Sequence, residues 1–266
     1  DCGGPLGAHN CQSAQSVIAS ALDQGGVAFI AHPLAEGESI SSFVWKTWDL
    51  WGQVIGFAGL ELWSDSKGTF KSSDRDAWGH WMSQLLPEVD EPANGYLQER
   101  AGYPNAFPVG IGNSDAHRTS DLGHTLTYCW FADGLNNTDP AIRRHKIISA
   151  LTEGHCIASN GPLVYATLNS ARIGEVARIG GVLPTLQINA RSTSQFGDLS
   201  GYSVRVYLHG ASTDRDYGPY TLPSGLSVAL GIGADDLALQ PGDRFMVVSM
   251  ERNCGQGQGC CSATSN

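Results

Sequence analysis

Charged side chains are scarce in this sequence. Asp, Glu, Lys and Arg make up 16% of the 266 residues, against about 25% in an average soluble domain. Only four of the 16 basic residues are lysines, and 26 acidic residues leave a net charge of -10. Such an excess of negative charge repels phosphate backbones and anionic lipid surfaces. We therefore expect no nucleic-acid partner.

Long apolar runs are also missing. The longest uncharged candidate, Val54 to Leu60, is short and contains two glycines, whereas a membrane helix needs about 18 to 20 apolar residues. We expect no membrane span. The sequence has neither an initiator Met nor a basic-then-apolar leader at Asp1, so Asp1 is expected to follow a processed or truncated start. A hydrophobic content of 41% excludes a disordered chain.

The seven cysteines form no C-x-x-C pair and have no zinc-finger spacing, which argues against thiolate-bound metal. They are either buried free thiols or disulfides of an exported protein. Their clusters at both chain ends and the shortage of lysine favour an extracellular or periplasmic location. We expect local disulfides within the clusters and Cys129 and Cys156 on neighbouring elements. The pairs expected at the ends are Cys2 with Cys11, and Cys254 with Cys260 or Cys261.

In the first part of the chain, helical patterns alternate with short apolar runs. A helix is expected from Ser13 to the stop at Gly25-Gly26, and a second one from the cap Asp139 to Gly154. The apolar runs show no polar alternation, which is typical of parallel strands buried on both faces. They are Val27–Ala31, Val54–Leu62 and Pro108–Gly112.

The pattern changes after Pro162. Leu186, Ile188 and Ala190 alternate with polar residues, as do Val204, Val206 and Leu208. This period of two predicts half-buried antiparallel strands. The expected fold class is therefore α/β, with a partial β/α barrel in residues 1–161 and a small antiparallel β-sandwich in residues 162–266.

Ligand-type side chains lie at or near the ends of all three apolar runs. His32 ends the first run, Glu61 lies in the second, and Asp115 and His117 follow the third. Strand ends of one parallel sheet share one edge, and carboxylate with imidazole suits zinc, manganese or iron. The alternative is structural: His32 as a hydrogen-bonded core residue, and Asp115 and His117 as a cap and a surface residue of a solvated loop.

Other catalytic patterns are missing. Ser114 lies in no G-x-S-x-G elbow, and no glycine-rich phosphate loop precedes a helix. The tryptophans between positions 45 and 81 suit either packing of helices on the sheet or an apolar pocket wall. Nucleophilic triads and nucleotide-binding folds are thus disfavoured.

Several short motifs together resemble, in order and spacing, the polymerase and histidinol phosphatase (PHP) superfamily of metallohydrolases, and most closely its carbaryl-hydrolase-like branch. They are Gly25 to Pro33 (GGVAFIAHP), Gly59 to Trp63 (GLELW), Gly112 to Arg118 (GNSDAHR), Leu122 to Thr125 (LGHT) and Gly154 to Pro162 (GHCIASNGP). The resemblance runs from about Ser13 to Pro162. The β-domain that follows also fits this branch.

The resemblance implies a distorted β/α barrel with two or three divalent metal ions (zinc, manganese or iron) at the strand ends. It implies hydrolysis of phosphate, carbamate or carboxylic esters of small molecules by metal-activated water. His32, Asp115 and His117 would be metal ligands. Glu61, at a characteristic position of the family, would stand with Asn113, Arg118 and His124 around these ligands.

The family's first strand carries a His-x-His pair, and here no two histidines are two positions apart. The chain resembles only the C-terminal half of the barrel plus the sandwich. Either a missing N-terminal segment or a neighbouring subunit is expected to cover the sheet edge before Val27. Two functions follow: a metal-dependent hydrolase completed by that segment, or a secreted, non-catalytic binding or assembly protein built on a degenerate barrel.

Overall fold

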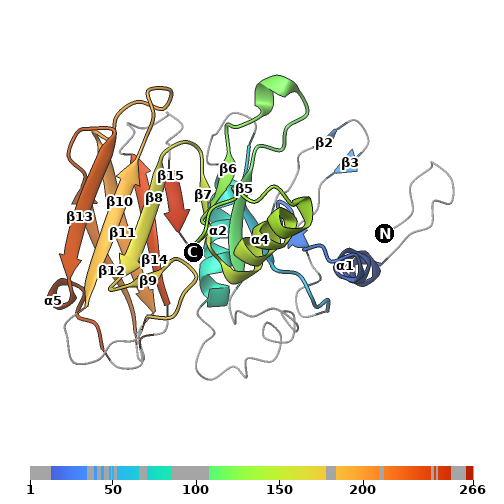
Figure 1. Cartoon of the computed structure of the whole chain (residues 1–266), viewed down its shortest axis with the longest axis horizontal. Coiled ribbons are helices and arrows are strands. Elements are labelled where there is room, and N and C mark those ends of the chain that lie inside the picture. Colours follow the sequence, from blue (N-terminus) through green and yellow to red (C-terminus); the bar gives the residue numbers. More distant parts are fainter. Residues whose placement is uncertain are drawn as a thin grey trace.

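The structure of the chain is a computed structural model with a mixed α/β architecture and more strand than helix. Helices and a small parallel sheet occupy one end of the molecule, and antiparallel sheets occupy the other (Figure 1). The structure describes residues 13–34, 39–40, 43–44, 48, 50, 53–65, 71–85, 108–177, 184–209, 213–240, 243, 245–252 and 262–265. The expected terminal disulfides involve residues 2, 11, 254, 260 and 261, which lie outside these ranges.

Helix α1 (Ala14–Asp23) begins where the sequence predicts. Ser13 caps its N-terminus by accepting a hydrogen bond from the backbone N–H of Ser16. Ile18 is buried, whereas Val17 on the neighbouring face is 52% exposed. The helix therefore packs along a narrow stripe, which includes Leu22 but not Val17.

A three-stranded parallel sheet follows, in the order β1-β4-β5. Its strands are β1 (Phe29–Ile30), β4 (Gly59–Ser64) and β5 (Val109–Asn113). β4 is the central strand and its first five residues are all buried, as expected for a parallel strand covered on both faces. At Gly59 a Cβ atom would lie 1.9 Å from the carbonyl oxygen of Val109. Only glycine permits the two strands to approach so closely.

Helix α2 (Ser72–Leu85) packs against β4. Trp81 is fully buried in the cluster that includes Phe57, Leu60 and Leu62. Its indole N–H donates to the carbonyl oxygen of Pro108, 2.9 Å away. The tryptophans of this helix therefore pack it onto the sheet, which is the structural alternative for the aromatic segment; Trp45 and Trp51 lie outside the described residues.

After β5 the chain forms the short helix η1 (Thr119–Asp121), β6 (Leu126–Cys129), α4 (Pro140–Glu153) and β7 (Cys156–Ser159). Helix α4 confirms its sequence signals. Asp139 accepts from the N–H of Ala141, Pro140 is the first helical residue, and Gly154 ends the helix at φ 77°. Left-handed backbone of this kind is typical of a glycine at a helix C-terminus.

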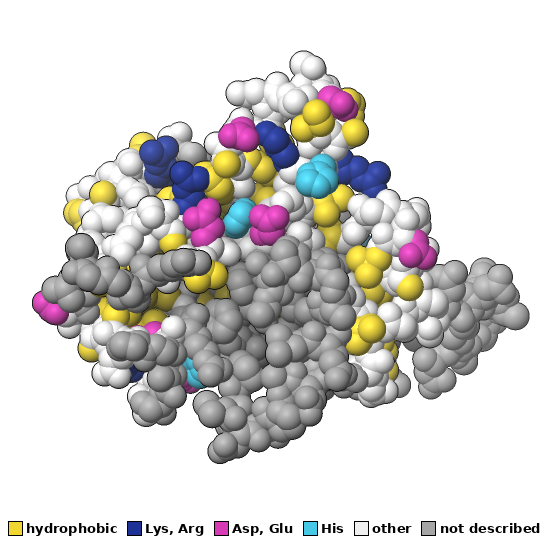
Figure 2. All heavy atoms as spheres, turned by 60° about the horizontal axis from the view of Figure 1, so that its bottom comes forward, with side chains coloured by type: hydrophobic (Ala, Val, Ile, Leu, Met, Phe, Trp, Pro, Cys, Tyr) yellow, Lys and Arg dark blue, Asp and Glu magenta, His cyan; other side chains and the backbone are white. Residues whose placement is uncertain are grey.

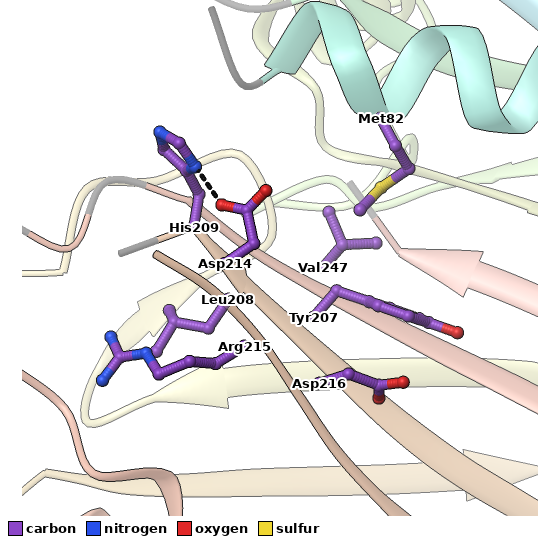
Figure 3. A pocket seen from close by; sticks show the side chains of 8 residues that line it. All are labelled: Met82, Tyr207, Leu208, His209, Asp214, Arg215, Asp216 and Val247. Carbon is purple, nitrogen blue, oxygen red and sulfur yellow. Dashed lines mark hydrogen bonds and ion pairs between the residues drawn. The ribbon is translucent and has the colours of Figure 1, made fainter. Parts of the chain in front are cut away.

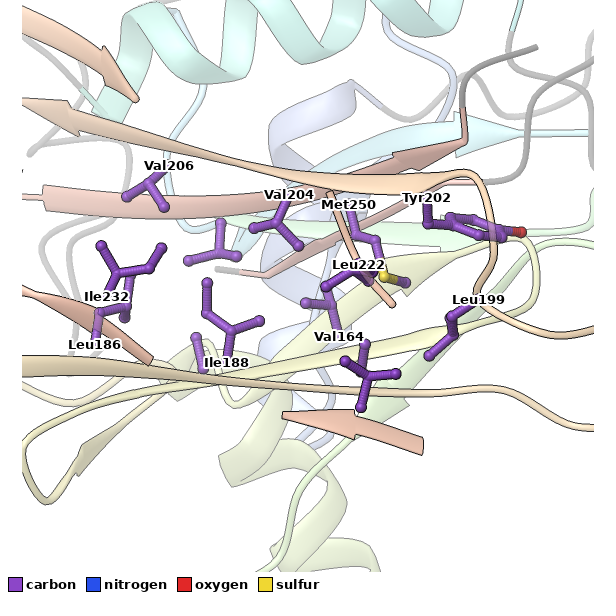
Figure 4. Close-up of a cluster of buried hydrophobic side chains, with 14 of the residues drawn as sticks. Val164, Leu186, Ile188, Leu199, Tyr202, Val204, Val206, Leu222, Ile232 and Met250 are labelled. Carbon is purple, nitrogen blue, oxygen red and sulfur yellow. The ribbon is translucent and has the colours of Figure 1, made fainter. Parts of the chain in front are cut away.

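Two antiparallel sheets face each other in the rest of the chain, in a sandwich-like arrangement. One sheet has the order β13-β10-β8-β9 and the other β12-β11-β14-β15-β7-β6. Their shared core includes Leu186, Ile188, Val204 and Met250 (Figure 4). The strands are β8 (Leu163–Leu168), β9 (Ala171–Arg172), β10 (Thr185–Arg191), β11 (Tyr202–His209), β12 (Asp214–Thr221), β13 (Ser227–Gly233), β14 (Phe245–Arg252) and β15 (Ser262–Ser265).

The larger antiparallel sheet runs across the predicted boundary at residue 161. β15 pairs with β14 on one side and with β7 on the other. The outer face of this sheet also contacts the first part, because Val247 and Tyr207 belong to the cluster around Trp81. Residues 1–161 and 162–266 therefore share a sheet and a hydrophobic cluster.

The elements described so far do not form a closed barrel. Within the described residues the parallel sheet has three strands, and β1 is hydrogen-bonded to β4 alone. The remaining elements are the two-stranded sheet of β2 (Ser39–Ile40) and β3 (Phe43–Val44), and the single turn α5 (Ala234–Leu237). None of the described helices is long and apolar enough to cross a bilayer.

Candidate functional site

The Glu61 side chain connects the central strand β4 to the ends of β1 and β5. It lies in β4 and only 2% of it is exposed. The backbone N–H of His32, just after β1, donates to Glu61 Oε2 at 2.5 Å. The side-chain amide of Asn113, at the end of β5, donates to Glu61 Oε1. The structure thus brings Glu61 and Asn113 together with the backbone of His32.

Both flanking loops carry backbone in the left-handed region. His32 has φ 30° and Asp115 has φ 44°. His32 also precedes Pro33, and the ring of a proline restricts the residue before it. Conformations of this kind cost on the order of 1–3 kcal/mol and persist where the surroundings fix them. Here the Glu61 carboxylate fixes the first loop, and Asn113 Oδ1, which accepts from the N–H of Asp115 at 2.6 Å, fixes the second.

Burial raises the pKa of Glu61 to about 7. The hydrogen bond from His32 lowers this pKa, while the negative charges of Asp115 and Asp74 raise it further. The carboxyl group therefore exchanges a proton near neutral pH. Asp115 also lies close enough to act on Glu61 electrostatically.

The loop after β5 holds its own side chains in place. His117 Nδ1 lies 2.7 Å from the carbonyl oxygen of Asp115 and His124 Nε2 lies 3.1 Å from that of Ser120. A ring nitrogen next to a carbonyl oxygen must donate, so neutral His117 keeps its lone pair on Nε2. The backbone N–H groups of His117 and Arg118 both donate to Asp121 Oδ2, at 3.2 and 2.9 Å. Arg118 thus takes part through its backbone, at the start of η1.

A second buried carboxylate, Asp74, lies near enough to Glu61 to act on it electrostatically. Asp74, in the first turn of α2, is 5% exposed and accepts from the N–H groups of Ser64 (3.1 Å) and Lys71 (2.8 Å). Burial raises its pKa to about 6. Lys71 Nζ lies 3.4 Å from Asp65 Oδ1. Asp65 and Asp74 were not among the residues predicted from the sequence, although Asp65 follows a buried strand, as Asp115 does.

The candidate ligands are of residue types that bind metal ions, but the described side chains do not converge on one point. Carboxylate and imidazole are ligands of zinc, manganese and iron. Among the residues that the structure describes, however, no three His, Cys, Asp or Glu side chains converge on one point. His32, Asp115 and His117 follow two strands of one sheet, and they do not complete a metal centre within the described part.

A small pocket lies between α2 and the outer face of the larger antiparallel sheet. Its lining comes from α2, β11, β12 and β14 and includes Met82, Tyr207 and Val247 (Figure 3). His209 Nδ1 lies 2.5 Å from Asp214 Oδ1 at its edge. The cavity measures about 190 Å³, less than the roughly 300–1,000 Å³ of most small-molecule sites. We assign it no ligand.

Charges of both signs share the visible surface. On the face in Figure 2, acidic, basic and histidine side chains are interspersed over the part whose residues are described. A surface patch of one charge sign attracts polyions of the opposite sign. The described part of this face carries both signs close together and therefore does not form such a patch.

The comparisons with known proteins identify no relative. No family model matches the chain, and neither the curated proteins nor the solved structures include a match.

Proposed function

We propose that this chain belongs to a metal-dependent hydrolase that cleaves phosphate, carbamate or carboxylic esters of small molecules with metal-activated water. The observation that supports it best is the Glu61 bridge, which accepts from His32 N–H and from the Asn113 amide. In open α/β sheets, ligands bind outside the carboxyl ends of the strands. The bridge lies at this edge, and the motifs around it resemble those of the PHP superfamily.

In this proposal His32, Asp115 and His117 contribute ligands for a divalent ion, zinc, manganese or iron. His117 supplies Nε2, because its Nδ1 donates to the carbonyl oxygen of Asp115. A bound ion lowers the pKa of its water and polarises the scissile bond. No step is assigned to the ion, because the described residues do not complete its coordination. The remaining ligands, for two or three ions in total, would come from an upstream segment or a neighbouring subunit.

Glu61 is a positioning residue in this scheme. Its carboxylate ties the His32 backbone to Asn113, and Asn113 in turn orients the backbone of Asp115. The hydrogen bonds of one carboxylate thus set the relative position of the proposed ligands. The parallel sheet would form part of a distorted β/α barrel. The cysteine clusters and the few lysines support an extracellular or periplasmic location.

The test is metal content and hydrolysis of p-nitrophenyl acetate and p-nitrophenyl phosphate, with and without the natural upstream segment. We expect bound metal and hydrolysis when the segment is present, and loss of both with a chelator. Asp115→Asn and His117→Gln should each lower the rate by at least about 10- to 100-fold, which is the loss found even for groups that only support a metal ligand. His145→Gln, an exposed histidine on α4, is the matched control.

Protein that contains the upstream segment but binds no metal and hydrolyses neither ester would overturn the hydrolase proposal. That result would favour the non-catalytic binding or assembly function. Equal losses in Asp115→Asn and His145→Gln would show that the assay reports folding rather than the site.

A further inference from the structure

Cys129 and Cys156 stand opposite each other on two neighbouring strands. β6 and β7 are antiparallel, and their register pairs Cys129 directly with Cys156. Neither cysteine takes part in a disulfide in the structure. Cys156 is completely buried, in a cluster with Val109 and Ala150, whereas Cys129 is partly exposed. Two thiols therefore share one face of one strand pair.

The hydrogen-bonding pattern between β6 and β7 places Cys129 and Cys156 at positions that a disulfide can join. The N–H of Trp130 donates to the carbonyl oxygen of His155 at 2.8 Å, while the N–H of His155 donates to the carbonyl oxygen of Ala150. This one cross-strand bond places Trp130 and His155 at a hydrogen-bonding position of the ladder. Such positions alternate with non-hydrogen-bonded pairs, whose Cα atoms are about 4.5 Å apart. Cys129 and Cys156, one position further, are of the second kind. Disulfides span Cα separations of about 4.4–6.8 Å, so the strands need not move.

The two thiols differ in reactivity. The S–H of Cys156 supports the thiolate of Cys129 by hydrogen bonding and lowers its pKa, whereas this interaction and burial raise the pKa of Cys156. The carbonyl oxygen of Ala150 lies 3.4 Å from Cys156 Sγ and accepts its S–H when Cys129 is protonated. Since the thiolate is the nucleophile, the more exposed Cys129 is the residue that attacks first.

We propose that Cys129 and Cys156 form a reversible cross-strand disulfide by exchange with a small disulfide such as oxidised glutathione. The Cys129 thiolate attacks one glutathione sulfur, breaks the S–S bond and releases one glutathione thiolate. Cys156 then loses its proton, attacks Cys129 Sγ and displaces the second glutathione. Two protein thiols are oxidised and one glutathione disulfide is reduced to two thiols.

The bridge would fasten an outer strand. β6 is the last strand of the six-stranded sheet, in the order that ends β15-β7-β6. It directly follows the loop that contains Asp115 and His117. Thr127 Oγ1 also accepts from the N–H of Gly112 at 3.0 Å and lies 2.7 Å from the Gly112 carbonyl oxygen. Oxidation would therefore stiffen the strand next to this loop, whatever the protein's activity.

The experiment maps the bridge in the full chain. The protein is equilibrated with reduced and oxidised glutathione, blocked with iodoacetamide and digested with trypsin. Cleavage after Arg118, Arg143, Lys146 and Arg172 places Cys129 and Cys156 in two peptides with one cysteine each, 119–143 and 147–172. We expect these two peptides linked under oxidising buffer and separate after dithiothreitol. Amide hydrogen exchange in 126–129 should slow on oxidation.

Single variants distinguish the steps. Cys156→Ala should stop at a stable glutathione adduct on peptide 119–143, and Cys129→Ala should leave Cys156 unmodified, because it is fully buried. Separate carbamidomethyl peptides in all glutathione buffers would overturn the proposal. So would a glutathione adduct on Cys129 in the unmutated chain, or linkage of either peptide to a peptide from the chain ends.

Discussion

Trp78 on α2 meets Tyr207 on β11 edge to face, with ring centroids 5.2 Å apart and an interplanar angle of 67°. The helix that carries Asp74 is thus packed directly against a strand of the antiparallel sheet. Val247 on β14 belongs to the same cluster. The parallel sheet, α2 and the larger antiparallel sheet therefore contribute side chains to one hydrophobic cluster, and we expect them to unfold together.

This contact can be measured with a double-mutant cycle. Trp78→Ala should lower the free energy of unfolding by about 2–4 kcal/mol, because loss of the indole leaves a cavity next to the ring of Tyr207. Combined with Tyr207→Leu, the coupling energy should be about 0.5–1.5 kcal/mol, as for other aromatic pairs. Urea denaturation followed by fluorescence and far-UV circular dichroism provides the values. Tyr207→Phe keeps the aromatic ring and should retain most of the coupling energy. If fluorescence and circular dichroism report separate unfolding transitions, the parallel and antiparallel sheets do not unfold together.

Gly59 should not tolerate a side chain. In Gly59→Ala the added Cβ would lie 1.9 Å from the carbonyl oxygen of Val109, so β4 and β5 must separate. We expect a loss of more than about 3 kcal/mol, or failure to fold. Gly79→Ala is the matched control, because nothing lies within 4 Å of its Cβ position in α2. Alanine should stabilise that helix by about 0.5–1 kcal/mol, and thermal melts of both variants would reveal the opposite signs.

Asp74 should make stability depend on pH. Its pKa is raised from 3.8 to about 6, mainly by burial, so the folded state binds the proton more tightly than the unfolded state. The free energy of unfolding should therefore fall as pH rises from about 4 to 6, by roughly 3 kcal/mol in total. Below about pH 4 both states are protonated and this contribution is constant.

The measurement is urea denaturation from pH 3.5 to 7.5. Asp74→Asn removes one titrating group and should make the decrease between pH 4 and 6 smaller. The part that remains comes from Glu61, whose pKa burial also raises, to about 7. The N–H groups of Ser64 and Lys71 donate to different oxygens of Asp74, so the single amide oxygen of the asparagine can accept from only one of them, and the variant should be less stable at every pH. Asp76→Asn, an exposed change in the same helix, is the matched control for loss of one charge. An unchanged slope in Asp74→Asn would show that other groups cause the pH dependence.

The proposed disulfide should stabilise the fold. A bridge between Cys129 and Cys156 closes a loop of 28 residues, for which loop-closure entropy predicts roughly 3–4 kcal/mol. Oxidised protein should unfold at higher urea concentration than the same protein with dithiothreitol. Cys129→Ala should show no such difference between the two buffers. A bridged form that is less stable than the reduced form would reveal strain in the strand pair.

Local signals predicted local structure well. Asp139, Pro140 and Gly154 set both ends of α4, since capping depends on neighbouring residues alone. The alternation of Leu186, Ile188 and Ala190 likewise matches the buried positions of β10. The expected neighbourhood of Cys129 and Cys156 is confirmed by their register.

Pairing between distant segments was harder to predict. β12 (Asp214–Thr221) alternates exposed and half-buried residues and has few large apolar side chains, so no periodic signal identified it. That His32, Glu61 and Asn113 lie at one edge of the sheet could be predicted, because the ends of neighbouring parallel strands share an edge. The hydrogen bonds between them depend on backbone positions, such as φ 30° at His32, that residue type does not determine.

The insertion of β15 between β14 and β7 constrains the order in which the protein folds. During synthesis β7 emerges about 100 residues before residues 262–265, and at 5–20 residues per second roughly 5–20 s separate them. Until then β7 and β14 have no strand between them. Contacts of such long sequence separation also slow folding. A nascent chain stalled before residue 262 should consequently present two open strand edges, which makes it a natural client for chaperones that shield such edges.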